Sequence, residues 1–329
     1  MNYGGIGNEH LWSVVLAGGD GERTRPFIER WLGYHIPKQY CAFFGQRSLF
    51  QETVDRADRL ASPLRRVAVV ARSHEQEARA QLEARQTGIV LPQPKNRGTA
   101  PGIMLAIARI LAEDARATVV LYPSDHFVRP EDAFIATVDR AVAAAEVYPD
   151  RLMILGVVPE RPELDYGWIQ PGPRINFQEA ELHAVSAFVE KPSRSAGRAI
   201  LANGGLWNSM VIIGKAGTFW SLGWRHVPEV MHPFASLRRS VGTSREQEVL
   251  KSIYEEMSIR DFSKDILEKA HEQLAVIRLA DVMWSDWGRP ERIAETLRSI
   301  GAQPAFSEEH LMARKDFTTP RRPSVSRGP

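Results

Sequence analysis

Residues 13–26 have the sequence Ser-Val-Val-Leu-Ala-Gly-Gly-Asp-Gly-Glu-Arg-Thr-Arg-Pro, in which an apolar run passes directly into a glycine-rich loop. The run at 13–16 predicts a buried strand. Three glycines within four residues free the backbone and leave no Cβ between main-chain N–H groups and a ligand. Arg23 and Arg25 follow at once, and a guanidinium offers donors that match phosphate oxygens. The stretch favours a polyphosphate-binding loop, with a ligand-free glycine turn as the alternative.

Two better-known phosphate motifs do not fit this loop. A Walker loop ends in Gly-Lys-Ser/Thr, whereas residues 22–24 are Glu-Arg-Thr. A dinucleotide-binding fingerprint needs glycine at the position of Thr24. Both an ordinary P-loop nucleotidase and a dehydrogenase are therefore disfavoured.

Apolar runs alternate with helical patterns through the first half of the chain. Strands are expected at 13–16, 67–70, 89–91, 118–122 and 152–157. Helices are expected near 48–60, from about 101 to 113 and at 131–147, and a capping-box pattern at Ser73–Gln76 predicts the start of a further helix. Continuous apolar strands separated by helices predict an α/β fold with a doubly wound, mostly parallel, Rossmann-like sheet. Ligands of such sheets bind beyond the carboxyl ends of the strands.

The second half has a more mixed pattern. Strands are expected at 166–169, 184–190 and 211–213, and helices at 192–203, near 245–256 and at 290–299. From 308 onward no apolar periodicity is present, and the stretch from Arg314 to Pro329 is basic and rich in Pro and Ser, which predicts a disordered tail.

Composition narrows the class of protein. The 329 residues include 42 Lys and Arg against 40 Asp and Glu, so the net charge of +2 points to neither a nucleic-acid nor a membrane partner. Cys41 is the single cysteine, which excludes an intrachain disulfide framework. No signal-peptide pattern and no apolar run of membrane-spanning length is present, so we expect a cytoplasmic protein.

Two carboxylates stand where they could hold a metal ion. Asp125 directly follows the predicted strand at 118–122, and Asp286 lies in Trp-Ser-Asp-Trp-Gly at 284–288. Beside a polyphosphate, such carboxylates are suited to Mg²⁺, which takes one or two of them together with phosphates and waters. Each aspartate could instead be a helix-capping or turn residue.

Other polar residues gain meaning only in combination. Lys38 follows Pro37 and could contact a phosphate, or be an ordinary surface lysine. Glu190 and Lys191 end a predicted strand and point to opposite faces, so one could bind hydroxyls and the other a phosphate. Asn208 beside Trp207 is a plausible sugar-binding pair, although a packed Trp is the simpler interpretation.

Taken in order, these motifs closely resemble those of the sugar-nucleotidyltransferase family, in particular its mannose-1-phosphate guanylyltransferase branch. The resemblance runs from about residue 13 to 300 and rests on Leu-Ala-Gly-Gly-Asp-Gly-Glu-Arg, Pro-Lys-Gln-Tyr, Gln-Pro-Lys-Asn-Arg-Gly-Thr-Ala-Pro, Tyr-Pro-Ser-Asp-His, Asp-Tyr-Gly-Trp-Ile, Phe-Val-Glu-Lys-Pro, Trp-Asn-Ser, Asp-Phe-Ser-Lys-Asp-Ile-Leu-Glu-Lys and Ser-Asp-Trp-Gly. It implies that a sugar 1-phosphate attacks the α-phosphorus of a nucleoside triphosphate, with mannose 1-phosphate and GTP as the favoured pair. The products are an NDP-sugar and pyrophosphate.

The resemblance also implies roles for individual residues. The nucleotide would be bound by Leu16, Ala17, Gly18, Gly19, Gly21, Gln93, Arg97 and Thr99. The catalytic group would be Arg23, Lys38 and Asp125, with Asp125 and Asp286 as Mg²⁺ ligands. The sugar phosphate would be bound by Gly167, Glu190, Lys191 and Asn208. It further implies a nucleotide-binding half at 11–160 and a sugar-binding half at 161–305. The glycine-rich composition of 1–10 predicts a flexible start, and the basic tail is expected at 306–329. The resemblance leaves open whether the protein forms a homodimer. No isomerase activity is expected, since no cupin-like segment is present.

The chain departs from the family pattern at several positions. Glu22, Thr24 and Arg25 replace Thr or Ser, Leu and an aromatic residue, and Glu22 should repel a triphosphate unless a base such as Arg25 pairs with it. Gly98 replaces Asn, Met210 replaces Gly, and Gly-Arg-Pro at 288–290 replaces Gly-Ser-Trp. These departures leave two alternatives: the same reaction with another base or sugar, such as glucose or heptose 1-phosphate, and an inactive subunit that senses an NDP-sugar.

Overall fold

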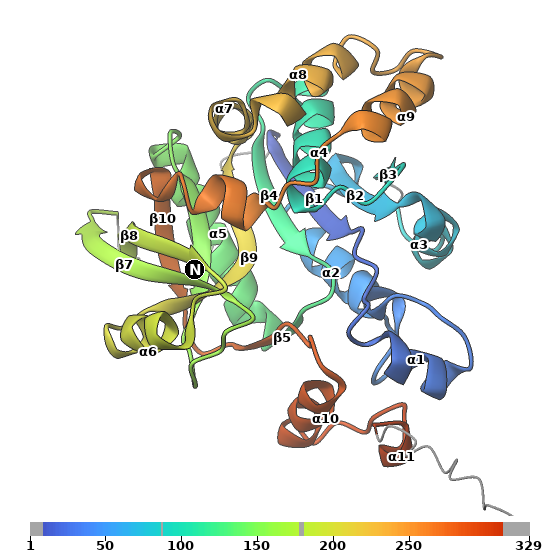
Figure 1. The fold of residues 1–329 in the computed structure, drawn as a ribbon, viewed down its shortest axis with the longest axis vertical. Coiled ribbons are helices and arrows are strands. Elements are labelled where there is room, and N and C mark those ends of the chain that lie inside the picture. Colours follow the sequence, from blue (N-terminus) through green and yellow to red (C-terminus); the bar gives the residue numbers. More distant parts are fainter. Residues whose placement is uncertain (1–8, 87, 178–180, 312–329) are drawn as a thin grey trace, which may run out of the picture.

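A nine-stranded sheet forms the centre of the molecule in the computed structural model, which describes residues 9–86, 88–177 and 181–311 (Figure 1). The strand order is β3-β2-β1-β4-β9-β6-β10-β8-β7. The first four of these strands are mutually parallel. Their bounds are β1 Leu11–Ala17, β2 Arg66–Ala71, β3 Ile89–Gln93 and β4 Thr118–Pro123.

The other half of the sheet is mixed and partly closed. Its strands are β6 Leu152–Val157, β7 Gly167–Ile175, β8 Leu182–Glu190, β9 Leu206–Lys215 and β10 Leu274–Leu279. β9 runs antiparallel between β4 and β6, whereas β10 is parallel to β6. β7 pairs with β8 and also with β9, which closes β9, β6, β10, β8 and β7 into a ring. A separate two-stranded sheet joins β5 (Phe127–Arg129) to β11 (Met283–Ser285).

Helices cover both faces of the sheet, as a doubly wound fold requires. Their bounds are α1 Arg25–Leu32, α2 Leu49–Ala57, α3 Glu75–Leu82, α4 Thr99–Glu113, α5 Glu131–Val147, α6 Arg194–Ala202, α7 Ala216–His226, α8 Pro228–Leu237, α9 Glu246–Glu256, α10 Pro290–Ser299 and α11 Glu308–Leu311. One hydrophobic core joins α4, α7, α8 and α9 to the sheet, and another joins α2, α3 and α5 to it. A third cluster packs α1 against α10.

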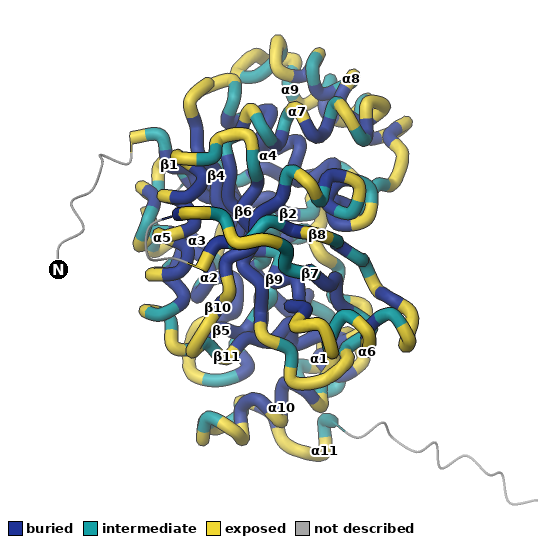
Figure 2. The backbone as a smooth tube through the Cα atoms, turned by 90° about the vertical axis from the view of Figure 1, so that its left-hand side faces the viewer, coloured by how far each residue is buried: buried dark blue, intermediate teal, exposed yellow. Residues whose placement is uncertain are grey.

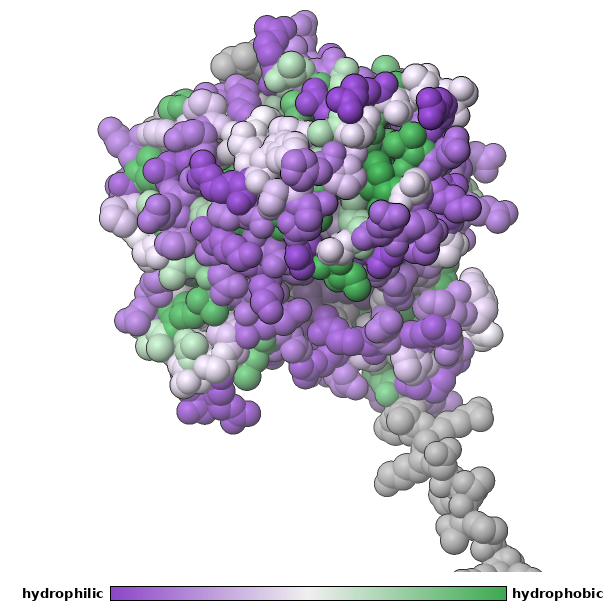
Figure 3. All heavy atoms as spheres, turned by 45° about the horizontal axis from the view of Figure 1, so that its top comes forward, coloured by the Kyte–Doolittle hydropathy of each residue, from purple (hydrophilic) through white to green (hydrophobic). Residues whose placement is uncertain are grey.

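The buried residues concentrate along the strands and the inner faces of these helices (Figure 2). β1 is buried on both faces. Its sequence is therefore a nearly continuous apolar run and does not alternate between apolar and polar residues. The face that carries α7, α8 and α9 is mainly hydrophilic, with scattered small hydrophobic patches (Figure 3). Among the described helices, none combines the length and apolar character needed to cross a bilayer.

Most predicted elements of the first half are confirmed, and α5, β6 and α10 have the predicted bounds. The capping box predicted at Ser73 is wrong: α3 begins at Glu75, after His74, without a side-chain cap. The capping box observed here is at the start of α2, where Ser48 and Gln51 exchange hydrogen bonds. The elements α1, α7, α8, β5, β10 and β11 were not predicted.

The chain continues to pack beyond the predicted end of the domain at 305. Phe306 is buried against Phe27, and α11 follows, with the Arg30 side chain donating to the carbonyl of His310. Residues 306–311 are therefore folded. The remainder of the predicted tail, 312–329, and the first eight residues of the predicted flexible N-terminus lie outside the described residues.

Candidate active site

The glycine-rich loop leaves β1 at the carboxyl edge of the sheet. Gly21 has a φ of +64°, and a Cβ at this position would come 3.2 Å from the Lys38 amide nitrogen. A Cβ on Gly18 would approach the side-chain nitrogen of Gln93 to 2.7 Å, whereas Gly19 has open space in front of it. The loop therefore needs glycine at position 21, a Cβ at position 18 would require the Gln93 side chain to move, and at position 19 the loop leaves room for an incoming group.

The segment after α1 holds this loop in place. Gln39 donates from Nε2 to the carbonyl oxygens of Ala17 and Gly19, at 3.0 and 2.8 Å. Tyr40 donates to the same Ala17 carbonyl. Sequence reasoning assigned no role to Gln39, although its place in Pro-Lys-Gln-Tyr next to Lys38 could have indicated one.

Lys38 lies beneath the loop with 5% of its surface exposed. Its Nζ is 3.0 Å from Asp125 Oδ2 and donates to the main-chain carbonyls of Asp286 and Trp287. A buried ammonium is tolerated only when it is paired and hydrogen-bonded, and these three oxygens supply that. Lys38 therefore ties the end of β4 to the turn after β11.

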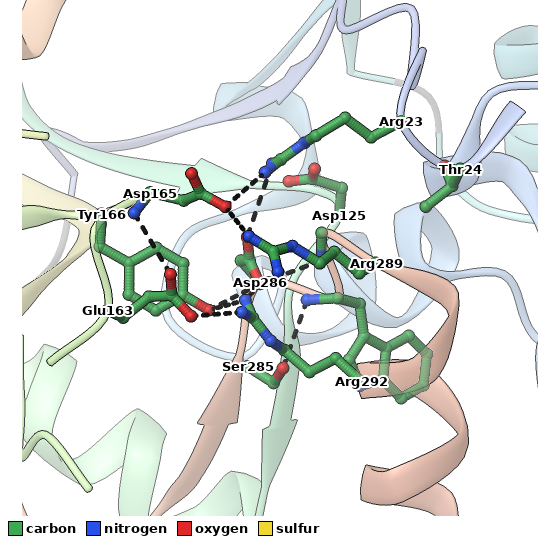
Figure 4. Close-up of polar contacts among 12 residues, drawn as sticks. Arg23, Thr24, Asp125, Glu163, Asp165, Tyr166, Ser285, Asp286, Arg289 and Arg292 are labelled. Carbon is green, nitrogen blue, oxygen red and sulfur yellow. Dashed lines mark hydrogen bonds and ion pairs between the residues drawn. The ribbon is translucent and has the colours of Figure 1, made fainter. Parts of the chain in front are cut away.

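Asp286 accepts hydrogen bonds from three directions (Figure 4). Its Oδ1 accepts from the Tyr166 hydroxyl at 2.7 Å, the Gly288 amide at 3.0 Å and Arg292 Nη1 at 2.5 Å. Burial alone would raise its pKa, but Lys38 and these donors outweigh burial and lower the pKa to about 2. Asp286 is therefore ionised at neutral pH.

Asp125 is the second carboxylate of the site. Burial acts to raise its pKa, but the nearby Lys38 ammonium and His126 hold it below its usual range. His126 Nε2 lies 3.5 Å from Asp125 Oδ1, and burial lowers the pKa of this imidazole. The predicted group of Lys38, Asp125 and Asp286 is thus brought together.

Arg23 extends from the glycine loop toward the carboxylates of Asp286 and Asp165. Its two terminal nitrogens lie 3.7 Å from Asp286 Oδ2 and 3.5 Å from Asp165 Oδ2. Arg289 also reaches Asp165, at 2.5 Å. Asp165 and Tyr166 belong to a motif quoted in the sequence, but their contacts to the arginines had no sequence signal.

A cavity of about 440 Å³ opens beside Asp286. It is lined by Arg23, His126, Asp165, Tyr166, Gly167, Glu190, Lys191, Asn208, Met210, Ser263, Trp284 and Asp286. The four predicted sugar-phosphate residues are all in this lining. A Cβ on Gly167 would come 2.6 Å from Glu190 Oε2, so glycine is required for Glu190 to occupy its place. Burial, followed by the charges of Asp261 and Glu268, raises the pKa of Glu190 to about 7.

Met210 is the least expected residue of the cavity. Its φ of +58° is in the left-handed region, which glycine adopts freely and other residues adopt with strain. Its amide donates to Asn208 Oδ1 at 2.9 Å, and its sulfur accepts from the Ser263 hydroxyl. The departure from glycine at this position therefore places a strained thioether side chain in the cavity wall.

The predicted nucleotide-binding segment, which runs from the last residue of β3 into α4, is largely engaged in structural contacts. Arg97 donates to the carbonyls of Tyr254 and Glu255 at the end of α9. Thr99 accepts from the Phe262 amide at 2.7 Å. Of the three side chains predicted to bind nucleotide in this segment, only Gln93 adjoins the glycine loop.

The surroundings of Gly98 explain why glycine replaces the asparagine of the family pattern at this position. Its φ is +86°, and a Cβ at this position would come 2.3 Å from the carbonyl oxygen of Arg260. Arg260 also exchanges main-chain hydrogen bonds with Arg97 and Ala100. The close approach of residue 260 leaves no space for a side chain at position 98.

Glu22 remains without a counter-ion in the part of the chain that the structure describes. Its expected partner, Arg25, instead pairs with Glu29 at 2.8 Å. Glu22 is exposed, so water screens its charge.

This α/β sheet presents a glycine loop, two ionised carboxylates around a buried lysine and a polar cavity at one edge, an arrangement suited to a transferase that handles phosphorylated substrates. The chain belongs to the nucleotidyl transferase family, whose model matches residues 12–233.

Individual relatives agree with this assignment. The chain is 30% identical over 286 residues to mannose-1-phosphate guanylyltransferase of Escherichia coli, covering 84% of this chain and 58% of that protein. It is 31% identical over 211 residues to alginate biosynthesis protein AlgA of Pseudomonas aeruginosa, covering 63% and 42%. The chain thus spans about half the length of the curated relatives it matches. A solved structure described as mannose-1-phosphate geranyltransferase from Thermus thermophilus superposes with a TM-score of 0.73 at 28% identity, covering 87% of this chain and 79% of that one.

Proposed function

We propose that this protein transfers a nucleotidyl group from a nucleoside triphosphate to a sugar 1-phosphate, forming an NDP-sugar and pyrophosphate. GTP and mannose 1-phosphate are the proposed substrates, because relatives covering 84% of the chain are named mannose-1-phosphate guanylyltransferase. Residues 11–160 would bind the nucleotide, and residues 161–305 the sugar phosphate.

One observation carries the proposal: Lys38 joins Asp125 to the turn of Asp286 between the glycine loop and the cavity. Reaction at the α-phosphorus requires the sugar phosphate and the triphosphate to meet in line, and positioning and charge neutralisation supply most of the catalysis. The loop at 18–21 would receive the triphosphate, and the cavity beside Asp286 would receive the sugar.

The chain's own residues would divide these tasks. Arg23 would neutralise the triphosphate and the departing pyrophosphate, because it is the exposed cation that extends from the loop toward the carboxylates. Glu190 and Asn208 would orient sugar hydroxyls by hydrogen bonding. Lys191, exposed at the cavity rim and 3.7 Å from Glu190, would pair with the sugar phosphate.

The two carboxylates fit a magnesium ion that enters together with the nucleotide. Asp125 and Asp286 both stay ionised, and among the described residues no cluster of three acidic, His or Cys side chains is built to hold a metal on its own. Two carboxylates are enough for Mg²⁺ when substrate phosphates and waters complete its shell. When bound, Mg²⁺ would neutralise charge that develops on the phosphate oxygens.

Met210 favours the alternative of a different sugar. Its side chain adds volume to the cavity wall at a position where the resembling family has glycine, so the cavity is narrower there. Met210 therefore bears on which base and which hexose the protein uses, whereas the transfer chemistry does not depend on it.

The test is pyrophosphate release by the purified protein with Mg²⁺, using each of the four nucleoside triphosphates against mannose, glucose and heptose 1-phosphates. Release confined to GTP and mannose 1-phosphate is expected. Release with another pair would keep the reaction and change the substrate. Nucleotide binding without release from any pair would overturn the proposal in favour of a sensor subunit.

A further inference from the structure

Two arginines from distant parts of the chain converge on one carboxylate oxygen. Arg23 Nη1 and Arg289 Nη2 lie 3.5 and 2.5 Å from the same atom, Asp165 Oδ2 (Figure 4). Arg23 belongs to the glycine loop, Arg289 precedes α10, and Asp165 precedes β7. Three otherwise separate segments thus meet at one anion.

This cluster differs from the buried ion pairs beside it. Arg292, on the first turn of α10, is 9% exposed and joins Asp286, Tyr166 and Glu163, so its donors are committed to fixed partners. The side chains of Arg23, Arg289 and Asp165 are 59%, 55% and 37% exposed. Exposed ion pairs are weak and exchange readily, so these two arginines are available to another anion.

The position of the cluster indicates which anion that is. Arg23 and Asp165 both line the cavity beside Asp286, and Arg23 follows the loop that would receive the triphosphate. Two guanidinium groups that converge on one oxygen make a site for phosphate, which offers more acceptor oxygens and more charge than a carboxylate.

We propose that Arg289 is a further phosphate-binding residue of this protein, acting with Arg23, and that Asp165 competes with the substrate phosphate for both arginines. The inference rests on the proposed function, since it concerns the phosphate of one of its two substrates. Residue 289 is serine in the pattern that the sequence resembles, so this chain would have gained a cation at the site.

The inference predicts opposite effects for the two halves of the cluster. Arg289→Ser removes a donor and should lower phosphate affinity about fivefold, the range of an exposed charge pair. Asp165→Asn keeps the shape but removes the competing charge, and should raise the affinity by a similar factor. Arg289→Lys keeps the charge without the planar fork and should fall between Arg289→Ser and the wild type.

Titration calorimetry with inorganic pyrophosphate and, separately, mannose 1-phosphate, each with Mg²⁺, tests this without turnover. An effect on pyrophosphate assigns the arginine pair to the triphosphate, and an effect on mannose 1-phosphate assigns it to the sugar phosphate. Arg298→Ser, which changes an exposed arginine at the other end of α10, is the matched control and should change neither affinity.

Two outcomes would overturn the inference. One is unchanged affinity for both probes in Arg289→Ser and Asp165→Asn. The other is a loss of affinity in both variants, which would make the cluster a structural bridge. Calorimetry measures binding directly and does not depend on turnover. If no substrate pair releases pyrophosphate, that counts against the proposed function and does not change the conclusion about Arg289 and Asp165.

Discussion

The Lys38 ammonium lies 3.0 Å from the Asp125 carboxylate, and Lys38 is almost completely buried. The same ammonium donates to the main-chain carbonyl of Asp286, so one side chain joins the two segments whose carboxylates would hold Mg²⁺. Its charge lowers the pKa of both. Lys38 therefore has two effects, fixing the distance between two segments and keeping their carboxylates ionised.

Replacing either member of this pair should abolish most of the activity. We expect Lys38→Ala and Asp125→Ala each to lower kcat by about 10²–10³-fold, the effect of removing one preorganised electrostatic group. Steady-state pyrophosphate release measures the loss, and circular dichroism checks that the fold persists. Lys251→Ala, at an exposed lysine of α9, serves as the control. Near-wild-type rates in both variants would remove Lys38 and Asp125 from the catalytic group.

Gly98 should tolerate no side chain. Gly98→Ala combines a left-handed φ of +86° with a Cβ only 2.3 Å from the Arg260 carbonyl oxygen. We expect the free energy of unfolding to fall by about 2–4 kcal/mol, from backbone strain and overpacking together. Urea denaturation gives the change.

Gly204 separates the two contributions to this loss. Its φ of +73° is similar, but a Cβ there would meet nothing within 4 Å. Gly204→Ala should therefore show the backbone strain alone, about 1 kcal/mol. Equal losses at the two positions would mean that residue 260 moves aside without penalty.

The positions along the chain of β1 to β4 and β6, and the edge of the sheet where the site lies, could be predicted from the sequence. Apolar runs such as 152–157 are strands because both of their faces are buried, and helices as long as α5 are marked by many periodic residues. The insertion of β9 between β4 and β6 could not be predicted, since it depends on contacts between residues far apart in the chain. β10 had no prediction, although its apolar run Leu-Ala-Val-Ile at 274–277 is a local strand signal of the same kind.

The site followed the same rule. Lys38, Asp125 and Asp286 could be named because their motifs, taken together and in order, resemble those of one family. Arg292 could not, because on an amphipathic helix it is indistinguishable from a solvent-facing arginine until Asp286 and Glu163 are seen against it. The contacts of Arg97 with α9 were missed likewise, as the sequence does not indicate where α9 lies.

Met210→Gly should widen the cavity and change the choice of sugar. Glycine adopts the φ of +58° without strain, which offsets part of the packing lost with the side chain, so we expect stability to change by no more than about 1 kcal/mol. Relative kcat/KM for a bulkier substrate such as an N-acetylhexosamine 1-phosphate should rise about tenfold over mannose 1-phosphate.

Met210→Ala is the matched variant for this change. It removes the same thioether contact with Ser263 but keeps a Cβ at the left-handed position, so it should widen the cavity and be less stable than Met210→Gly. An unchanged substrate preference in both variants would show that Met210 does not limit the sugar.

Glu190 should make stability depend on pH. Burial and the neighbouring carboxylates raise its pKa from an ordinary value near 4.5 to about 7. Between these two values the folded protein holds a proton that the unfolded chain has released, so stability falls as the pH rises through this window. Glu190→Gln removes the titrating group. Relative to that variant, the wild type should lose about 3 kcal/mol between pH 4.5 and 7, measured by urea denaturation at a series of pH values.

The same titration should appear in substrate binding. Above pH 7 Glu190 is a carboxylate that can accept hydrogen bonds from two sugar hydroxyls, whereas below it the carboxyl is protonated and accepts fewer. The KM for the sugar phosphate should therefore fall as the pH rises through 7 in the wild type. The phosphate of the substrate also titrates near this range, but it does so equally with Glu190→Gln, so the difference between the two proteins isolates Glu190. Parallel pH profiles would place Glu190 outside the sugar contacts, even if its effect on stability is as expected.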